Sequence, residues 1–190
     1  MNAVYFLLNN LEGDHRNSWP WIREAADAMM DVNGDYKSHY QNSSTEVDIS
    51  TVSGGQYDID YVSRFDCSKL DQWEVVFDHM ESLGIMAHFV LQETENECLL
   101  DMGQTGVQRR IYLREMVARF GHHLAISWNL GEENGPAHWT PIGQTDDMRR
   151  DMASYLKMLN PYPSNVVLHT HADDGGQEEM LSPLLGFADL

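Results

Sequence analysis

The chain has 190 residues, of which 42% are hydrophobic and 22% are charged. This length and composition suit one domain with a sizeable core and exclude an intrinsically disordered tail. The two cysteines, Cys67 and Cys98, are too few for a disulfide-stapled miniature. A formal net charge of −18 repels phosphate backbones and anionic lipid headgroups, so we expect neither nucleic acid nor membranes as partners.

Four short apolar runs predict the strands of the fold. They are Val4–Leu8, Ile85–Leu91, Leu124–Leu130 and Val166–His169. Each run is apolar almost throughout instead of alternating with polar residues, which is typical of strands buried on both faces of a parallel sheet.

Helical patterns connect the later runs. Residues 68–83, 105–120 and 146–159 carry apolar side chains at helical spacing. Ser68 and Thr145 are the predicted N-caps of the first and third helices. The resulting order, β-α-β-α-β-α-β, predicts an α/β fold whose parallel strands are joined by right-handed helical crossovers.

The connection after the first strand is unusually long. Residues 11–67 are rich in polar residues, and a connection of this length is typical of a functional loop or an insertion. We therefore treat residues 1–190 as a single domain with one inserted loop at 11–67.

Polar residues follow each predicted strand. Because the carboxyl ends of parallel strands meet at one edge of the sheet, functional side chains gather there. An adjacent acidic pair at such a position has to be solvated or paired, which favours a functional interpretation of Glu132 and Glu133. The candidate residues are Asn9, Asn10, Gln92, Glu93, Asn129, Glu132, Glu133, His169 and His171.

Side-chain alternation assigns two faces to the third strand. Ser127, Asn129, Gly131 and Glu133 are expected on one face, toward the interior of a barrel. The other face is expected to carry Trp128, Leu130 and Glu132.

The segment 128–134, Trp-Asn-Leu-Gly-Glu-Glu-Asn, resembles the Trp-x-Leu-Gly-Asn-Glu-Pro segment of retaining glycoside hydrolases with (β/α)8 barrels. That segment ends the fourth strand in the group that includes cellulases, mannanases and β-galactosidases. The resemblance implies that Glu133 is the general acid/base. Glu132 stands where the family has an asparagine that binds the sugar 2-hydroxyl, and Asn134 stands where it has a proline.

A looser similarity extends along residues 63–73, 84–91 and 119–130, which resemble apiosidase-like and cellulase-like barrel proteins of bacterial polysaccharide degradation. It implies a partial (β/α)8 barrel that comprises about the second to the fifth βα unit. The family's nucleophile, a glutamate after the seventh strand, is then expected outside this chain. The resemblance also implies a secreted or periplasmic parent enzyme, although no signal peptide is recognisable here.

Glycoside hydrolysis needs two carboxylates, because one must protonate the leaving oxygen while the other attacks the anomeric carbon or activates water. With Glu133 as the acid/base, we expect a carbohydrate substrate and no cofactor or bound metal. Gln92 and Glu93 are alternatively solvated surface residues that do not contact substrate. Trp139 is alternatively a residue that anchors its loop to the barrel. The predicted substrate contacts are Asn10, Gln92, Glu93, Asn129, Glu132, Trp139 and His169.

Two other interpretations stay open at this point. His169 and His171 form an H-x-H pair at a strand end, as in metal-dependent barrel hydrolases, and His88, Glu93 or Glu133 would complete the set of ligands. The chain is alternatively a noncatalytic barrel remnant, since four strands leave two sheet edges open, through which copies of the chain are expected to associate.

Overall fold

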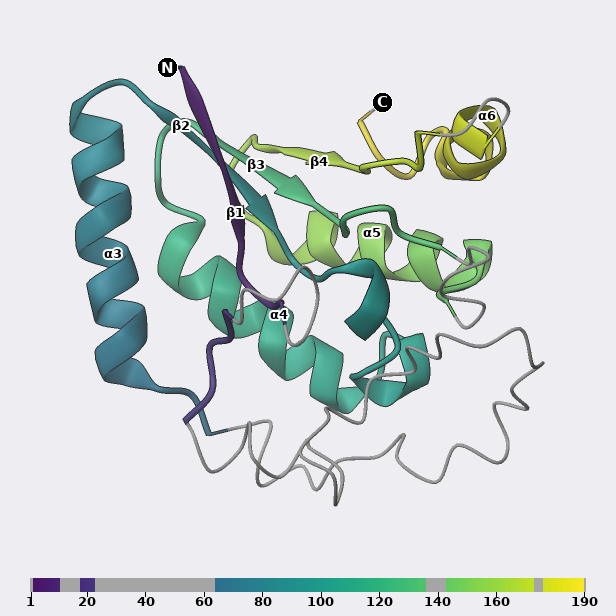
Figure 1. The fold of residues 1–190 in the computed structure, drawn as a ribbon, viewed down its shortest axis with the longest axis horizontal. Coiled ribbons are helices and arrows are strands. Elements are labelled where there is room, and N and C mark those ends of the chain that lie inside the picture. Colours follow the sequence, from purple (N-terminus) through teal and green to yellow (C-terminus); the bar gives the residue numbers. More distant parts are fainter. Residues whose placement is uncertain (1, 11–17, 23–63, 136–142, 173–175, 190) are drawn as a thin grey trace.

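In the described part of the chain, four parallel strands form one sheet in the spatial order β1-β2-β3-β4 (Figure 1). The computed structural model describes residues 2–10, 18–22, 64–135, 143–172 and 176–189. The strands are β1 (Ala3–Leu7), β2 (Met86–Val90), β3 (Ile126–Asn129) and β4 (Asn165–Val167). All four lie within or beside the predicted apolar runs, so the expected parallel α/β class is confirmed.

One helix precedes each of the last three strands. These helices are α3 (Cys67–Ser82), α4 (Val107–Phe120) and α5 (Asp146–Leu159), and a short helix, α6 (Gly176–Leu181), follows β4. Thr145 caps α5 as predicted, whereas Asp66 and not Ser68 caps α3, since the Asp66 carboxylate accepts the Lys69 N–H at 3.0 Å. Short 3₁₀ turns occupy Thr94–Asn96, Asp101–Gly103 and Ser182–Leu184.

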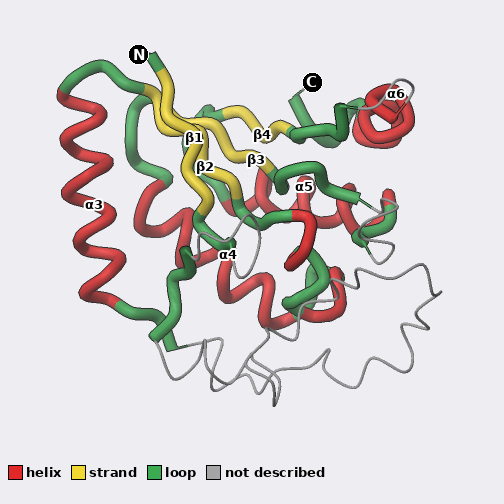
Figure 2. The backbone as a smooth tube through the Cα atoms, in the orientation of Figure 1, coloured by secondary structure: helices red, strands yellow, loops and turns green. Residues whose placement is uncertain are grey.

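The helices α3, α4 and α5 pack on one face of the sheet (Figures 1 and 2). The rings of Phe77 and Phe89 lie 4.7 Å apart between α3 and β2, and Phe89 also contacts Phe120 of α4 and Trp128 of β3. Burial of such large rings is the main source of stability in this layer. Every second strand residue therefore faces the helices, and the residues between them face the opposite side.

The two described ends of the long 11–67 connection lie side by side. Trp21 and Phe65 form an antiparallel bridge, and the Asp66 N–H donates to the Pro20 carbonyl at 2.9 Å. Trp21 is fully buried. Residues 20–22 and 64–66 of the predicted loop thus meet beside the start of α3. Residues 11–17 and 23–63 lie outside the described part of the chain.

The outer edge of β4 is covered by the segment that follows α6. The Asp189 N–H donates to the Val166 carbonyl at 2.6 Å, and the Asp189 carboxylate accepts the Val166 N–H at 2.9 Å. Lys157 of α5 holds the same carboxylate at 2.7 Å. Asp189 thus satisfies both outward polar groups of Val166 and shields this part of the β4 edge, while association of copies through sheet edges stays a prediction.

No helix in the described ranges combines the length and the apolar character that crossing a bilayer requires.

Candidate functional site

Four side chains from four strands or their ends meet on the sheet face opposite the helices. The Tyr5 ring stacks on His88 with ring centres 5.2 Å apart and meets His169 edge-on at 5.9 Å. The Tyr5 hydroxyl lies 2.9 Å from His169 Nδ1. Asn129 Nδ2 lies 3.1 Å from His88 Nε2. We call these residues, together with Glu93, Glu132 and Glu133, the strand-end cluster.

The hydrogen bonds of Asn129 fix the tautomer of His88. Asn129 Oδ1 accepts the Gly131 N–H at 3.1 Å, so the amide nitrogen of Asn129 faces His88. An amide nitrogen only donates, and His88 Nε2 must therefore accept as an unprotonated nitrogen. Burial, with a smaller contribution from His169, lowers the pKa of His88, which agrees with a neutral imidazole.

Glu132 and Glu133 lie in a tight turn directly after β3. The strand ends at Asn129, so its alternation does not continue into the turn. Glu132 Oε1 lies 3.9 Å from His169 Nδ1, which places this carboxylate with the strand-end cluster. The expectation that Glu132 shares the face of Trp128 and Leu130 is therefore wrong.

Glu133 has a backbone φ of 44° in this turn. A positive φ is uncommon for a residue with a side chain and marks a conformation that the surroundings have to maintain. Glu133 Oε2 lies 3.7 Å from Nδ1 of the buried His171, and a third of the Glu133 side chain is exposed. This carboxylate is both accessible and held in place.

Burial and the charges of nearby carboxylates both act on the Tyr5 hydroxyl. The pKa of Tyr5 lies far above its usual range, first because the phenol is partly buried and then because Glu132, Glu93 and Glu133 oppose a further negative charge. The phenol consequently stays neutral and keeps its O–H at physiological pH. The cluster offers neutral hydroxyl and amide donors beside carboxylate acceptors.

Hydrogen bonds hold the turn against the segment that follows β2. The Thr94 hydroxyl donates to the Glu132 carbonyl at 2.8 Å, and the Glu132 N–H donates to the Gln92 carbonyl at 3.1 Å. Gly131 permits this approach, because a Cβ there would lie 3.0 Å from Gln92 Cγ. A side chain at this position would press on Gln92 and Asn134, so the glycine of the motif suits the close packing here.

A buried polar network supports the turn from behind. Glu97 accepts the Gly135 N–H at 3.0 Å and the Asn134 amide at 2.5 Å. Arg109 donates to Gln92 and to the carbonyl of Glu97, and Gln144 bonds both Gln92 and Asn134. Burial raises the pKa of Glu97 to about 8, although its hydrogen bonds and the nearby arginines act in the opposite direction.

Most of the predicted contact residues reach the strand-end cluster, but two of the described ones lie elsewhere. Gln92 lies in the buried network, bonded to Arg109 and Gln144. Asn10 is buried, and its backbone exchanges hydrogen bonds with Ser18 at 2.6 and 2.9 Å. Trp139 lies outside the described residues.

The H-x-H pair does not converge on one point. His169 contacts Tyr5 and Glu132, whereas His171 lies beside Glu133. Within the described ranges, neither histidine belongs to a group of three or more potential metal ligands. The geometry therefore gives no support to the metal-dependent alternative.

Tyr5, Glu97 and Arg109 were not predicted from the sequence as part of the site, and His88 was considered only as a ligand in the metal-dependent alternative. Alternation along β1 would have indicated Tyr5, since Val4 and Phe6 both pack against the core. The partners of Glu97 and Arg109 come from separate loops and helices, and no spacing in the sequence relates them.

No family model and no curated protein matches this chain. A similar solved structure is the crystal structure of a putative glycoside hydrolase from Bacteroides vulgatus, with 16% sequence identity and a TM-score of 0.52. The similarity covers 90% of this chain and 29% of that protein. At this identity the likeness shows the fold alone, and the chain spans less than a third of its neighbour's length.

Proposed function

We propose that this chain supplies part of the active site of a glycoside hydrolase, with Glu133 as the general acid/base. The observation that carries the proposal is the placement of two carboxylates in the turn after β3, with Glu132 3.9 Å from His169 and Glu133 3.7 Å from His171. This turn lies at the carboxyl ends of the parallel strands, the edge at which α/β folds place their chemistry. The sequence resemblance around Glu133 and the fold similarity to a glycoside hydrolase point the same way.

The residues of the strand-end cluster suit a sugar substrate. A carboxylic acid is needed to protonate the leaving oxygen, because an alkoxide leaves poorly. Glu133 is accessible and belongs to a supported turn, as this role demands. Tyr5, Asn129 and His169 offer hydrogen-bonding groups for sugar hydroxyls, and Glu132 replaces the amide that the resembling family uses at its position.

We further propose that the four strands form part of a (β/α)8 barrel, about the second to the fifth unit. The strands are parallel, lie in sequential order and carry helices on one face, as barrel units do. In this arrangement the second carboxylate comes from a strand that faces the cluster across the barrel. The complete site then belongs to the whole protein, of which this chain forms one wall.

The test is Glu133→Gln in the whole protein, assayed on aryl glycosides with good leaving groups and on alkyl glycosides with poor ones. Dinitrophenyl glycosides need little protonation, whereas alkyl glycosides need a strong acid. We expect a loss of about 10²–10⁴-fold in kcat/KM for poor leaving groups, a much smaller loss for dinitrophenyl substrates, and unchanged binding.

Glu178→Gln serves as the matched control, because Glu178 is an exposed glutamate on α6. This variant should keep the activity of the unmodified protein. Full activity of Glu133→Gln on poor leaving groups would disprove the assigned role. Failure of the unmodified whole protein to hydrolyse any glycoside in a broad panel would contradict the proposed function itself and favour a noncatalytic role.

A further inference from the structure

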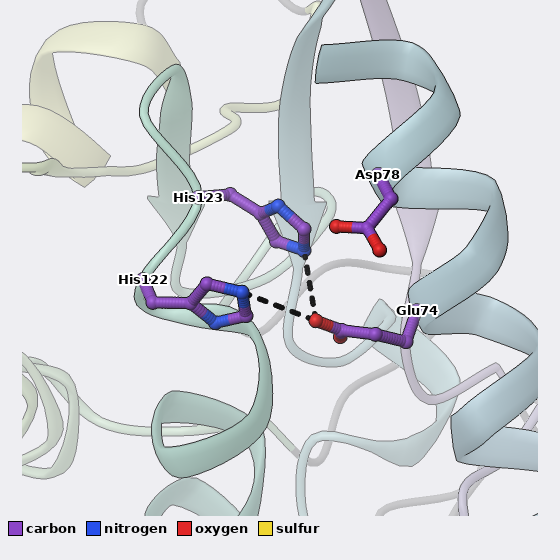
Figure 3. A group of neighbouring side chains, drawn as sticks. All are labelled: Glu74, Asp78, His122 and His123. Carbon is purple, nitrogen blue, oxygen red and sulfur yellow. Dashed lines mark ion pairs between the residues drawn. The ribbon is translucent and has the colours of Figure 1, made fainter. Parts of the chain in front are cut away.

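Two histidines and two carboxylates meet at the opposite end of the molecule from the strand-end cluster. Glu74 and Asp78 lie one turn apart on α3, and His122 and His123 lie in the connection between α4 and β3 (Figure 3). One ligand atom from each of the four residues lies within 4.8 Å of every other. Figure 3 shows all four side chains turned toward a common point.

Two spacings within this group are close to what one small ion requires. Nε2 of His122 lies 3.2 Å from Glu74 Oε1, and Nε2 of His123 lies 3.6 Å from the same oxygen. A tetrahedral ion with bonds of about 2.0–2.1 Å holds its ligand atoms roughly 3.3 Å apart. The two imidazoles are stacked, with ring centres 4.4 Å apart, and Nε2 of each ring faces the same oxygen of Glu74.

A contact of His123 Nδ1 leaves the other ring nitrogen, Nε2, free to face a cation. Its Nδ1 lies 3.1 Å from Glu81 Oε2, and that oxygen also accepts the Leu124 N–H at 2.9 Å. Because a carboxylate only accepts, Nδ1 of His123 carries a proton and Nε2 is left to face Glu74. A carboxylate that orients a histidine in this way is the usual second partner of a metal-bound imidazole.

Two buried atoms in this group have no hydrogen-bond partner among the described residues. They are Nε2 of His123, whose side chain is only 4% exposed, and Oε2 of Glu74. A neutral His123 would present a lone pair to the Glu74 carboxylate, and two acceptors repel each other unless a cation lies between them. A cation at this point is either a proton on His123 or a metal ion.

We propose that Glu74, Asp78, His122 and His123 bind one divalent transition-metal ion of the zinc class. Two imidazole nitrogens exclude Mg²⁺ and Ca²⁺ as preferred occupants, because both ions favour all-oxygen sites. Two imidazoles and two carboxylates supply four protein ligands, and the two carboxylate charges balance those of a divalent ion. Four protein ligands leave no open position on the ion, which is typical of a structural site. The ion would tie α3 to the connection that leads into β3.

The test is Zn²⁺ titration of the protein, free of any polyhistidine tag, followed by calorimetry and by thermal unfolding. We expect one ion per chain and a rise in melting temperature of roughly 5–10 °C at about 100 times the dissociation constant. Co²⁺ in place of Zn²⁺ should give the strong visible absorption of tetrahedral coordination. His122→Ala and Asp78→Asn, both at exposed positions, should weaken binding at least tenfold without preventing folding.

His79→Ala is the matched control, since His79 is an exposed histidine on α3 next to Asp78 and outside the group. It should bind Zn²⁺ like the unmodified protein. Binding that is unsaturable, or that survives in both ligand variants, would overturn the proposal. So would a melting temperature insensitive to Zn²⁺, which would leave a protonated His123 between Glu74 and Glu81 as the occupant.

Discussion

The hydroxyl of Tyr5 lies 2.9 Å from Nδ1 of His169, although Tyr5 belongs to the first strand and His169 follows the last. Three inter-strand spacings separate β1 from β4, which amounts to roughly 14 Å across a flat sheet. Side chains that stand upright on a flat sheet would not meet over this distance. His169 lies two residues beyond the end of β4, so the contact requires this segment and the two side chains to lean over the strands between them.

The bond between Tyr5 and His169 should be measurable as a coupling energy. We expect a double-mutant cycle of Tyr5→Phe and His169→Ala to give a coupling of about 0.5–1.5 kcal/mol, because Tyr5→Phe removes only the hydroxyl and keeps the ring contacts. Urea unfolding of the four proteins supplies the free energies. Strictly additive effects would show that the two side chains do not bond in solution.

The bond from Asn129 to His88 leads to a prediction about pH. Burial holds the pKa of His88 below 6.5, so this group's contribution to the free energy of unfolding is present above pH 6.5 and is lost as the pH falls through the folded-state pKa. Asn129→Asp places a carboxylate 3.1 Å from His88 Nε2 and should raise the pKa of His88 by about one unit or more.

NMR titration of the histidine ring protons measures this shift directly. Asn160→Asp, at the C-cap of α5 and far along the chain from His88, controls for the added charge and should leave the His88 titration unchanged. An equally low pKa of His88 in Asn129→Asp would contradict the assigned geometry and tautomer.

The elements that sequence predicted well are those that depend on local pattern. The apolar runs located all four strands, and Thr145 marked the start of α5, because burial and capping act over a few neighbouring residues. Glu132 was assigned to the wrong face because alternation holds only while the strand lasts. The turn after Asn129 ended that periodicity before Glu132 was reached.

Contacts between distant segments could not be predicted in this way. The group around His123 joins a helix face to a loop more than forty positions away, and the sequence interpretation expected no metal. The spacing of Glu74 and Asp78 marks one helix face, yet nothing in the sequence says which loop that face meets. For the same reason, the hydrogen bond from Gly135 to Glu97 could not be predicted from the sequence.

Glu97 gives the last prediction, which concerns stability and pH. Its pKa is about 8 in the folded protein against about 4.5 in the unfolded chain, so the folded state keeps a proton that the unfolded state releases. The stabilising contribution of this proton is present below pH 4.5 and is lost as the pH rises through 8. The contribution of Glu97 to the free energy of unfolding should therefore decline between pH 4.5 and pH 8.

Glu97→Gln isolates this contribution because it mimics the protonated side chain and still accepts hydrogen bonds from Asn134 and Gly135. Relative to the unmodified protein, the variant should gain up to about 1.4 kcal/mol per pH unit between pH 5 and 8, as measured by urea unfolding. Glu178→Gln, at an exposed position, should show no such trend. A difference between Glu97→Gln and the unmodified protein that stays constant with pH would mean that Glu97 is ionised throughout. In that case the hydrogen bonds donated by Asn134 and Gly135, together with the positive charges of Arg109 and Arg149, outweigh the cost of burying the Glu97 charge.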